Sequence, residues 1–286
     1  MKILLIPFLV LCVVRISKSE CPPEEEIRPC VCSQSSNPIT VKCSRIINQE
    51  TLVKVFTKSF DFPMQSLILQ DSSIPYVPSK VPESKKLGSL SIINCSMSSV
   101  FEQPPKSPHL VSLTLANITL QRGIDWEILS GLQPQVIHIE GVHVKKIKPS
   151  FTKHLSPALK KFKLINTRTV SFSENAFAKF NNLEELVCAH GSIRTITRSM
   201  LPTTCKLSLL DLTANEIDEL PDGLFSNCHK LAKVLLAYNQ LRHFTAAVWQ
   251  EVWDHALLEV TLEGEIPTLV KKDLCSCCYL SHLVDI

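Results

Sequence analysis

The stretch LSLLDLTANEIDELPDGLF, from Leu207 to Phe225, decides the fold. Its apolar residues follow neither the strict alternation of a half-buried strand nor the three-and-four spacing of an amphipathic helix. They fit the template L-x-x-L-x-L-x-x-N-x-L, in which Leu210 and Leu212 alternate and Asn215 follows them. One such unit is too small to bury its own apolar row, so the pattern predicts a fold only if it recurs.

The template recurs at a nearly constant interval through most of the chain. Nine units align with it, the last of them incomplete, and they start at residues 64, 87, 110, 134, 159, 183, 207, 231 and 257. Successive starts lie 23 to 26 residues apart, a period and consensus typical of the leucine-rich repeat. Only Asn215 and Asn239 hold the Asn position, whereas Ile118 and Val142 cannot form the same hydrogen bonds. We therefore expect less regular turns in the N-terminal half.

The repeat predicts a curved solenoid. In each unit the x-L-x-L stretch forms a short strand whose leucines point inward, while the x residues point outward onto a shared concave face. A second apolar row, for example Phe172, Phe177 and Phe180, would line the convex side, and stacked units would bury a continuous core. Trp249 and Trp253 are expected on one face of a short helix, in the core rather than in a binding site. We predict an α/β solenoid, a curved leucine-rich repeat horseshoe of about nine repeats with a parallel concave sheet.

The N-terminus has the features of a secretory signal peptide. Lys2 precedes an apolar run from Ile3 to Val14, and Ser17 and Ser19 provide small residues before a cleavage site. The 12-residue run is short for a membrane span, although an uncleaved anchor is the alternative, and no second long apolar run follows. We predict a secreted, extracellular protein with no membrane span after cleavage. The predicted organisation is a signal peptide (1–19), an N-terminal cysteine-rich cap (20–63), leucine-rich repeats (64–270) and an incomplete or degenerate C-terminal cap (271–286).

Because the protein is predicted to be secreted, its cysteines are expected to form disulfides. Cys12 belongs to the signal peptide, and the remaining 11 of the 12 are expected mostly to pair in an oxidising compartment. Because this number is odd, at least one thiol is free or pairs with another chain. Four cysteines precede the first repeat: Cys21, Cys30, Cys32 and Cys43. Sequence alone allows three connectivities for them, and their spacing does not match the paired C-x2-C of a zinc site.

These four cysteines resemble the disulfide-knotted N-terminal cap of secreted leucine-rich repeat proteins. The resemblance implies the pairs Cys21–Cys32 and Cys30–Cys43, which would close the open end of the solenoid. At the other end, Cys275 and Cys277 resemble the C-x-C element that opens a C-terminal cap and are assigned to disulfides there. Such caps normally have two further cysteines later, but only Cys278 follows before Ile286, so either the cap is degenerate or the sequence is truncated.

The predicted mature N-terminus, CPPEEEIRPCVCS from Cys21 to Ser33, is similar to one arthropod group in particular. The group takes its name from the non-catalytic, leucine-rich subunit of a secreted luciferase, oplophorus-luciferin 2-monooxygenase. Its members begin with a similar C-P…E-x-I-x-P-C-x-C cap and end with a C-x-C element. The resemblance implies a secreted, non-enzymatic partner protein. It does not imply light emission, because the catalytic subunit is a separate chain.

Charged residues occupy two neighbouring predicted strands. The first strand has Lys160, Lys161 and Lys163. The next strand places Glu184 and Glu185 beside the first two of these lysines. One interpretation is a cross-strand charge ladder that keeps the concave face soluble. The other is a polar docking patch for a protein partner.

Other features bear on where a partner would bind. Tyr238 lies beside apolar surface in a later unit, a combination that suits a protein contact. His138 and Glu140 are expected to face the concavity, where a His is more often an ordinary surface residue than a ligand. Asn94 and Asn117 begin N-x-S/T sequons at equivalent positions of adjacent units, so glycans there would project from one rim and shift binding toward later repeats. The alternative is that one or both are unmodified, Asn94 especially if its neighbour Cys95 is in a disulfide.

Composition argues against several functions. The formal net charge is only +3, which does not fit a chain that binds polyanions as a whole or has nucleic-acid partners. The 7 glycines form no phosphate-binding loop, and no catalytic, metal or cofactor motif occurs in the sequence. We predict a secreted, non-enzymatic protein without cofactors that binds an extracellular protein ligand or partner subunit through its concave face. The alternatives are the ectodomain of a Toll-like or other leucine-rich repeat receptor, an extracellular-matrix protein, or an enzyme with a site built across strands.

Overall fold

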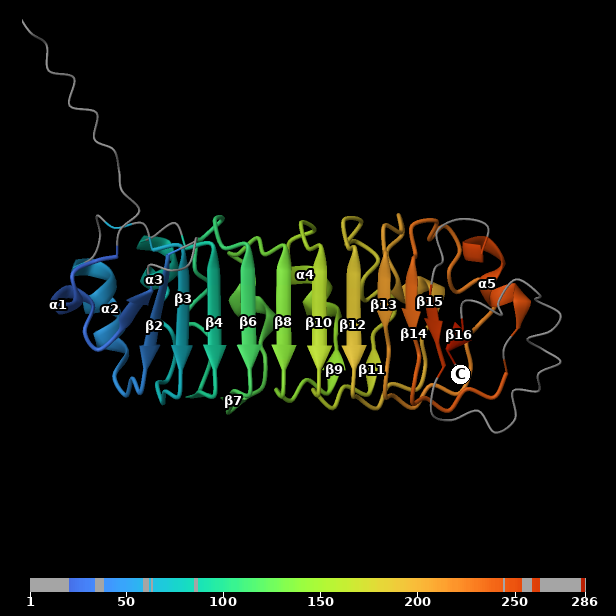
Figure 1. Ribbon diagram of the computed structural model, residues 1–286, viewed down its shortest axis with the longest axis horizontal. Coiled ribbons are helices and arrows are strands. Elements are labelled where there is room, and N and C mark those ends of the chain that lie inside the picture. Colours follow the sequence, from blue (N-terminus) through green and yellow to red (C-terminus); the bar gives the residue numbers. More distant parts are fainter. Residues whose placement is uncertain are drawn as a thin grey trace, which may run out of the picture.

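The computed structural model describes residues 21–33, 39–58, 62, 64–84, 87–243, 245–253, 259–262 and 284–285. Its main feature is a 12-stranded sheet whose strands lie side by side in chain order (Figure 1). The strands are β1 (Val31–Ser33), β2 (Thr40–Ser44), β3 (Ser66–Gln70), β4 (Ser89–Ile93), β6 (Ser112–Ala116), β8 (Val136–Glu140), β10 (Lys161–Ile165), β12 (Glu185–Ala189), β13 (Leu209–Asp211), β14 (Lys233–Leu235), β15 (Glu259–Thr261) and β16 (Val284–Asp285). Neighbouring strands pair in parallel, except that β1 runs antiparallel to β2.

The register of the sheet confirms the alignment of the repeats. Each inward residue of one strand faces its equivalent in the next, as Leu186 faces Leu210. The row formed in this way is fully buried and consists of Leu67, Leu90, Leu113, Ile137, Phe162, Leu186, Leu210, Val234 and Val260. The sheet also extends into the segment predicted as the N-terminal cap, because β2 pairs in parallel with β3. Leu257, where the last unit was predicted to start, lies outside the described residues.

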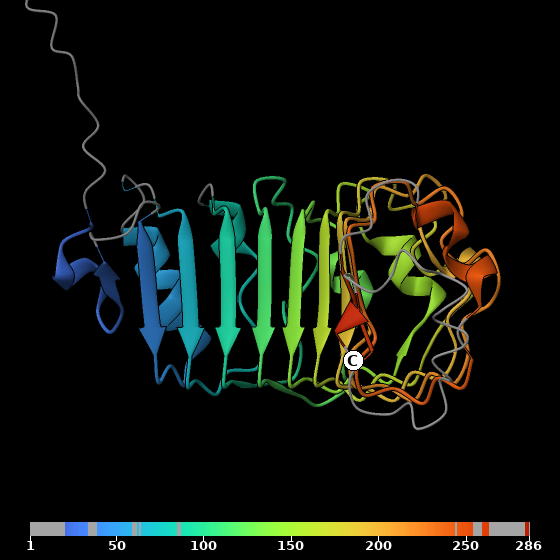
Figure 2. The same ribbon diagram turned by 45° about the vertical axis from the view of Figure 1, so that its right-hand side comes forward.

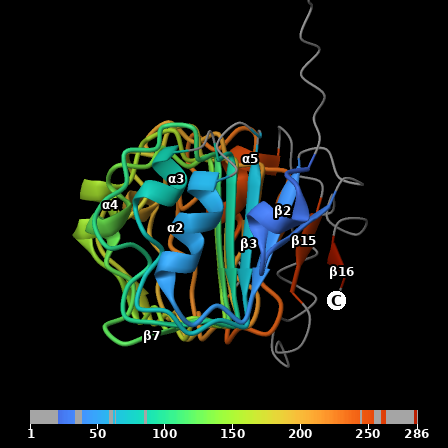
Figure 3. The same ribbon diagram turned by 90° about the vertical axis from the view of Figure 1, so that its left-hand side faces the viewer.

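Short helices and small sheets form the convex side. Figure 3 shows α2, α3 and α4 on the opposite side of the molecule from the large sheet. The elements outside this sheet are α1 (Glu24–Ile27), α2 (Gln49–Lys58), α3 (Lys80–Ser84), α4 (Pro149–His154), α5 (Ala246–Trp253), the 3-10 helices η1 (Trp126–Leu129) and η2 (Arg198–Met200), and the strands β5 (Ser96–Met97), β7 (Thr119–Leu120), β9 (Lys146–Ile147) and β11 (Ser171–Phe172). In the part of the chain that the structure describes, no helix combines the length and apolarity needed to cross a membrane.

An aromatic cluster fills the space between the sheet and the convex side. The Phe151 ring lies 4.9 Å from Trp126, 4.8 Å from Phe162 and 5.3 Å from Phe180, centroid to centroid. The predicted second apolar row is therefore core, since Phe172, Phe177 and Phe180 are all buried. Trp249 on α5 is also buried, as predicted, whereas the side chain of Trp253 lies outside the description.

A residue with left-handed backbone conformation follows each of the nine strands of the large sheet from β2 to β14. These residues have φ between 49° and 62° and are Arg45, Asp71, Asn94, Asn117, Gly141, Asn166, His190, Ala214 and Tyr238. Asn, Asp and Gly are the residues that adopt this conformation most readily, and they hold five of the nine positions. At Gly141 a Cβ atom would also lie 2.1 Å from Asn117 Oδ1, so a larger residue there would require the Asn117 side chain to move. The chain thus turns at the same point in every repeat.

The position after this turn forms the hydrogen bonds expected from its residue type. Asn215 Oδ1 accepts from the Ile193 backbone N–H at 3.1 Å, and its Nδ2 donates to the Cys188 and Leu212 carbonyls, both at 2.8 Å. Asn239 repeats this arrangement in the next unit. Ser72 makes a smaller set, accepting from Ile46 N–H and donating to the Gln70 carbonyl. The structure confirms that the N-terminal turns have fewer such bonds.

Three disulfides lie within the described residues. Cys21–Cys32 and Cys30–Cys43 are the pairs that the cap resemblance implied. The third, Cys205–Cys228, joins neighbouring repeats and was not predicted. Cys95 is buried without a disulfide, so the doubt about the sequon at Asn94 that rested on a bridge at Cys95 is removed. Cys275 and Cys277 lie outside the described residues.

Candidate partner-binding surface

The outward positions of the strands form one continuous face, which Figure 2 shows in an oblique view. From β3 to β6 these positions carry no charge: they are Ser66, Ile68, Gln70, Ser89, Ser91, Ile93, Ser112, Thr114 and Ala116. Apart from Lys42 on β2, charged side chains begin at β8 and continue through β15. Any electrostatic recognition by this face is therefore concentrated in its middle and later strands.

One carboxylate joins two lysines at the centre of this face. Lys161 Nζ donates to Glu185 Oε1 at 2.6 Å, and Lys163 Nζ lies 3.1 Å from Glu185 Oε2. We call Lys161, Lys163 and Glu185 the charged cluster. Lys161 and Glu185 face each other in the register of β10 and β12, as the sequence predicted. The predicted cross-strand charge ladder is thus present as ion pairs between β10 and β12.

The protonation of the charged cluster follows from these contacts. Burial opposes the charge of Glu185, but the hydrogen bonds from Lys161 and Lys163 outweigh it and lower the pKa of this carboxyl. The same hydrogen bond raises the pKa of the Lys161 ammonium. The Glu185 side chain is 21% exposed, against 41% for Lys161 and 32% for Lys163, so the lysines present the more accessible charge.

Lys160 and Glu184 were predicted on these strands, and this placement is wrong. β10 begins at Lys161 and β12 at Glu185, so both residues lie one position before their strands and are exposed. Their backbones are nevertheless in contact, because the Lys160 carbonyl accepts from the Glu184 N–H at 2.7 Å. The template did not distinguish the first strand residue from the one before it. Both side chains therefore border the charged cluster rather than belong to it.

Apolar side chains flank the charged cluster on its C-terminal side. Val187 faces Lys163 in the register, and Leu209 faces Glu185. On the N-terminal side His138 faces Lys163, with His138 Nε2 3.5 Å from Glu140 Oε2. Charged and apolar groups thus alternate over neighbouring strands, a mixture typical of protein–protein interfaces. Sequence reasoning missed Val187 and Leu209, although both occupy outward positions of the template.

Tyr238 is not on the strands but at the turn that follows β14, and it is 53% exposed. It holds the same left-handed position as Asn94 and Asn117, so all three lie along one rim of the sheet. Strand β13 separates its repeat from the charged cluster. Asn94 Nδ2 donates to Asp71 Oδ1 at 3.2 Å, and both sequon asparagines are exposed. The predicted contact residues therefore form two groups, one on the concave face and one on the rim.

Among the residues that the structure describes, no three His, Cys, Asp or Glu side chains gather closely enough to hold a metal ion.

No protein-family model matches the sequence, and no curated protein does. Solved structures do match. A complex of TLR13 with ssRNA13 is 18% identical over 76% of this chain, with a TM-score of 0.62, although the chain covers only 34% of that protein. FLRT2, in an octameric complex with Latrophilin 3 and Unc5D, is 16% identical over 93% of this chain and 92% of its own, with a TM-score of 0.61. Human 5T4 (trophoblast glycoprotein) is 15% identical over 94% of this chain and 90% of its own, with a TM-score of 0.59.

These neighbours define the class of the protein. It has the leucine-rich repeat fold, with a disulfide-bonded N-terminal cap. The similarity extends over most of the FLRT2 and 5T4 chains in those structures.

Proposed function

We propose that this protein is a secreted, non-enzymatic leucine-rich repeat protein that binds a protein partner through the middle of its concave face. The observation that carries the proposal is the charged cluster beside Val187 and Leu209. Two accessible lysines would give a partner's acidic groups a defined position, and the half-buried Leu209 would add apolar contact area, whereas Val187 is already buried. Glu185 holds both lysines in place before binding, which lowers the entropy lost on association.

Secretion is supported by the signal-peptide pattern of residues 1–19 and by the disulfides, which form and persist in oxidising compartments. The similarity of the N-terminal cap to the non-catalytic subunit group of oplophorus-luciferin 2-monooxygenase supports a role as an accessory subunit. In that case the partner would be a separate catalytic chain.

A receptor ectodomain is the second candidate. The matching FLRT2 structure is an assembly with two other proteins, and the matching TLR13 structure is a complex with RNA. For this chain we favour a protein ligand, because Glu185 already neutralises much of the positive charge on the concave face.

The experiment starts from a pull-down from extracellular fluid with the chain from Glu20 as bait. The captured partner is then purified, and its Kd is measured for the wild type and for a Lys161→Gln, Lys163→Gln, Glu185→Gln variant. This variant removes all three charges without leaving an unpaired carboxylate. We expect the affinity to fall by about tenfold or more, since interfacial charge pairs contribute at least ~1.5 kcal/mol when they couple closely.

The matched control is Lys42→Gln with Lys54→Gln. Both lysines are exposed; Lys42 is on β2, far from the charged cluster along the sheet, and Lys54 is on α2, on the convex side. Its affinity should stay within about twofold of the wild type. Equal affinity of the triple variant and the wild type would overturn the proposed site. A control variant that also lost binding would show general charge attraction instead.

A further inference from the structure

The convex side contains a hollow that no function discussed above uses. It has a volume of about 1010 Å³ and is lined by segments of three successive repeats, including residues 98–99, 121–126, 143–146 and 148. Trp126 is buried at its base, where its ring packs edge-on against Phe151 at 4.9 Å. The hollow thus lies directly over the aromatic core.

An interruption of the convex strands creates the hollow. β5 pairs with β7, and β9 pairs with β11, but within the described residues no ladder joins β7 to β9. After β7 the chain turns through Gly123, at φ +71°, into η1 instead of continuing beside the next repeat. The two neighbouring strand edges are therefore left apart, and the hollow lies between them.

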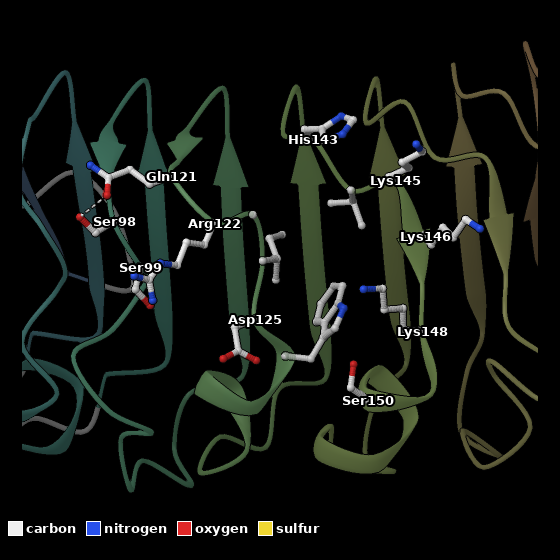
Figure 4. A pocket seen from close by; sticks show the side chains of 14 residues that line it. Ser98, Ser99, Gln121, Arg122, Asp125, His143, Lys145, Lys146, Lys148 and Ser150 are labelled. Atoms are coloured by element: carbon white, nitrogen blue, oxygen red, sulfur yellow. Dashed lines mark hydrogen bonds between the residues drawn. The ribbon is translucent and has the colours of Figure 1, made fainter.

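The side chains that line the hollow are strongly basic. They include Arg122, His143, Lys145, Lys146 and Lys148, against the single carboxylate of Asp125. Figure 4 shows Arg122 on one side of the hollow and the three lysines on the other. Asp125 Oδ1 accepts from the Glu127 backbone N–H at 3.0 Å, which caps η1. Positive groups thus lie on both sides of the hollow.

These basic groups differ from those on the concave face. There Lys161 and Lys163 pair with Glu185, and Lys233 pairs with Glu259. For the basic residues of the hollow, the described part of the chain provides no ion pair within 4.0 Å. The net charge of the whole chain is only +3, so this group of basic side chains is a local excess of positive charge. A concave site with one sign of charge focuses the field and attracts oppositely charged ligands.

We propose that the convex hollow binds a sulfated polysaccharide. Such a chain is extended and carries repeated anionic groups, which matches basic side chains on both sides of an open hollow. A single-stranded nucleic acid fits less well, because its bases need exposed aromatic rings for stacking and Trp126 is buried. The proposal uses the secretion proposed above, since these polysaccharides are extracellular, but it is independent of the concave-face partner.

The test is binding of a heparin-derived oligosaccharide to the purified chain, measured by calorimetry at two salt concentrations. The hollow variant carries Lys145→Gln, Lys146→Gln and Lys148→Gln, whose side chains are all exposed. The control variant carries Lys54→Gln, Lys80→Gln and Lys230→Gln, which removes the same charge from exposed positions elsewhere. Circular dichroism and thermal melting check that both variants are folded.

We expect the wild type to bind and to weaken as salt rises. The hollow variant should lose about tenfold or more in affinity, and the control should stay within about twofold. A further Arg122→Gln change should weaken binding again, because it removes charge from the opposite side. Equal losses in both triple variants would overturn the proposal, as would an absence of binding by the wild type at low salt. Tighter binding of unsulfated hyaluronan, or of a single-stranded RNA of similar charge, would also contradict it.

Discussion

The amide of Asn215 shows how one side chain holds two repeats together. It bonds to backbone groups of its own unit and of the preceding one, and it is buried. Buried backbone groups that lose their partners cost free energy, so the residue at this position has a large effect on stability. Where the residue is Ile118 or Val142, no such bond is possible and the apolar side chain packs in the core instead.

We therefore expect Asn215→Ala to lower the free energy of unfolding by about 3 kcal/mol, because four backbone partners lose their bonds. Ser72→Ala removes only two bonds and should cost roughly 1 kcal/mol. Urea unfolding with the disulfides intact measures both values. Equal losses of unfolding free energy in the two variants would show that the Asn215 hydrogen bonds add no more stability than those of Ser72.

Glu185 provides a pH-dependent test. The pKa of its carboxyl is lowered in the folded protein, so its contribution to stability is present above the ordinary value of 4.5 and is lost as the pH falls through the lowered pKa. The wild type should thus melt at a higher temperature than Glu185→Gln at pH 7, and the difference should shrink in acid. A difference that stays constant down to pH 3 would mean that the ionised carboxylate does not stabilise the fold.

At the scale of elements, the strands could be predicted from the sequence and the connections could not. Alternating leucines at a fixed period determine which residues pair, so Lys161 and Glu185, 24 residues apart, face each other as expected. β2 was missed because Val41 and Cys43 alternate without the rest of the template. The start of β10 was placed one residue early for a similar reason. The repeat template shows which residues point inward, but it does not show at which residue the strand begins.

The hollow and the third disulfide depend on contacts between convex segments, which have no common pattern in this sequence. Residues of three repeats meet around the hollow, and only the run HVKKIK, from His143 to Lys148, gave a local signal. Cys205 and Cys228 are 23 residues apart, a repeat length that would have suggested their pairing.

The Cys205–Cys228 disulfide should stabilise the later repeats. Closing a loop of this length reduces the entropy of the unfolded chain by roughly 3 kcal/mol in free energy. We expect the double variant Cys205→Ala, Cys228→Ala to lose about that much in urea unfolding. Cys188→Ala, at a buried cysteine without a disulfide, is the comparison for the effect of removing a sulfur from the core. If both variants lost the same amount, the disulfide itself would contribute nothing.

At the scale of the whole molecule, the two sides of the solenoid differ in whether their basic side chains have carboxylate partners. On the concave face lysines are held by carboxylates between apolar neighbours, an arrangement suited to a specific protein contact. On the convex side basic groups surround an open hollow without carboxylate partners in the described residues, an arrangement suited to a polyanion. We infer that the molecule can be held by an extracellular polysaccharide while its concave face remains available.

The most direct test of this account is to measure both ligands on both variants in one assay. The chain is captured on a surface coated with heparin-derived oligosaccharide, and the purified protein partner is then added. We predict that the Lys161→Gln, Lys163→Gln, Glu185→Gln variant is captured normally but does not bind the partner. The Lys145→Gln, Lys146→Gln, Lys148→Gln variant, attached by a tag instead, should bind the partner normally but not the polysaccharide. Loss of both ligands in either folded variant, or full partner binding by the first, would contradict the assignment of separate functions to the two faces.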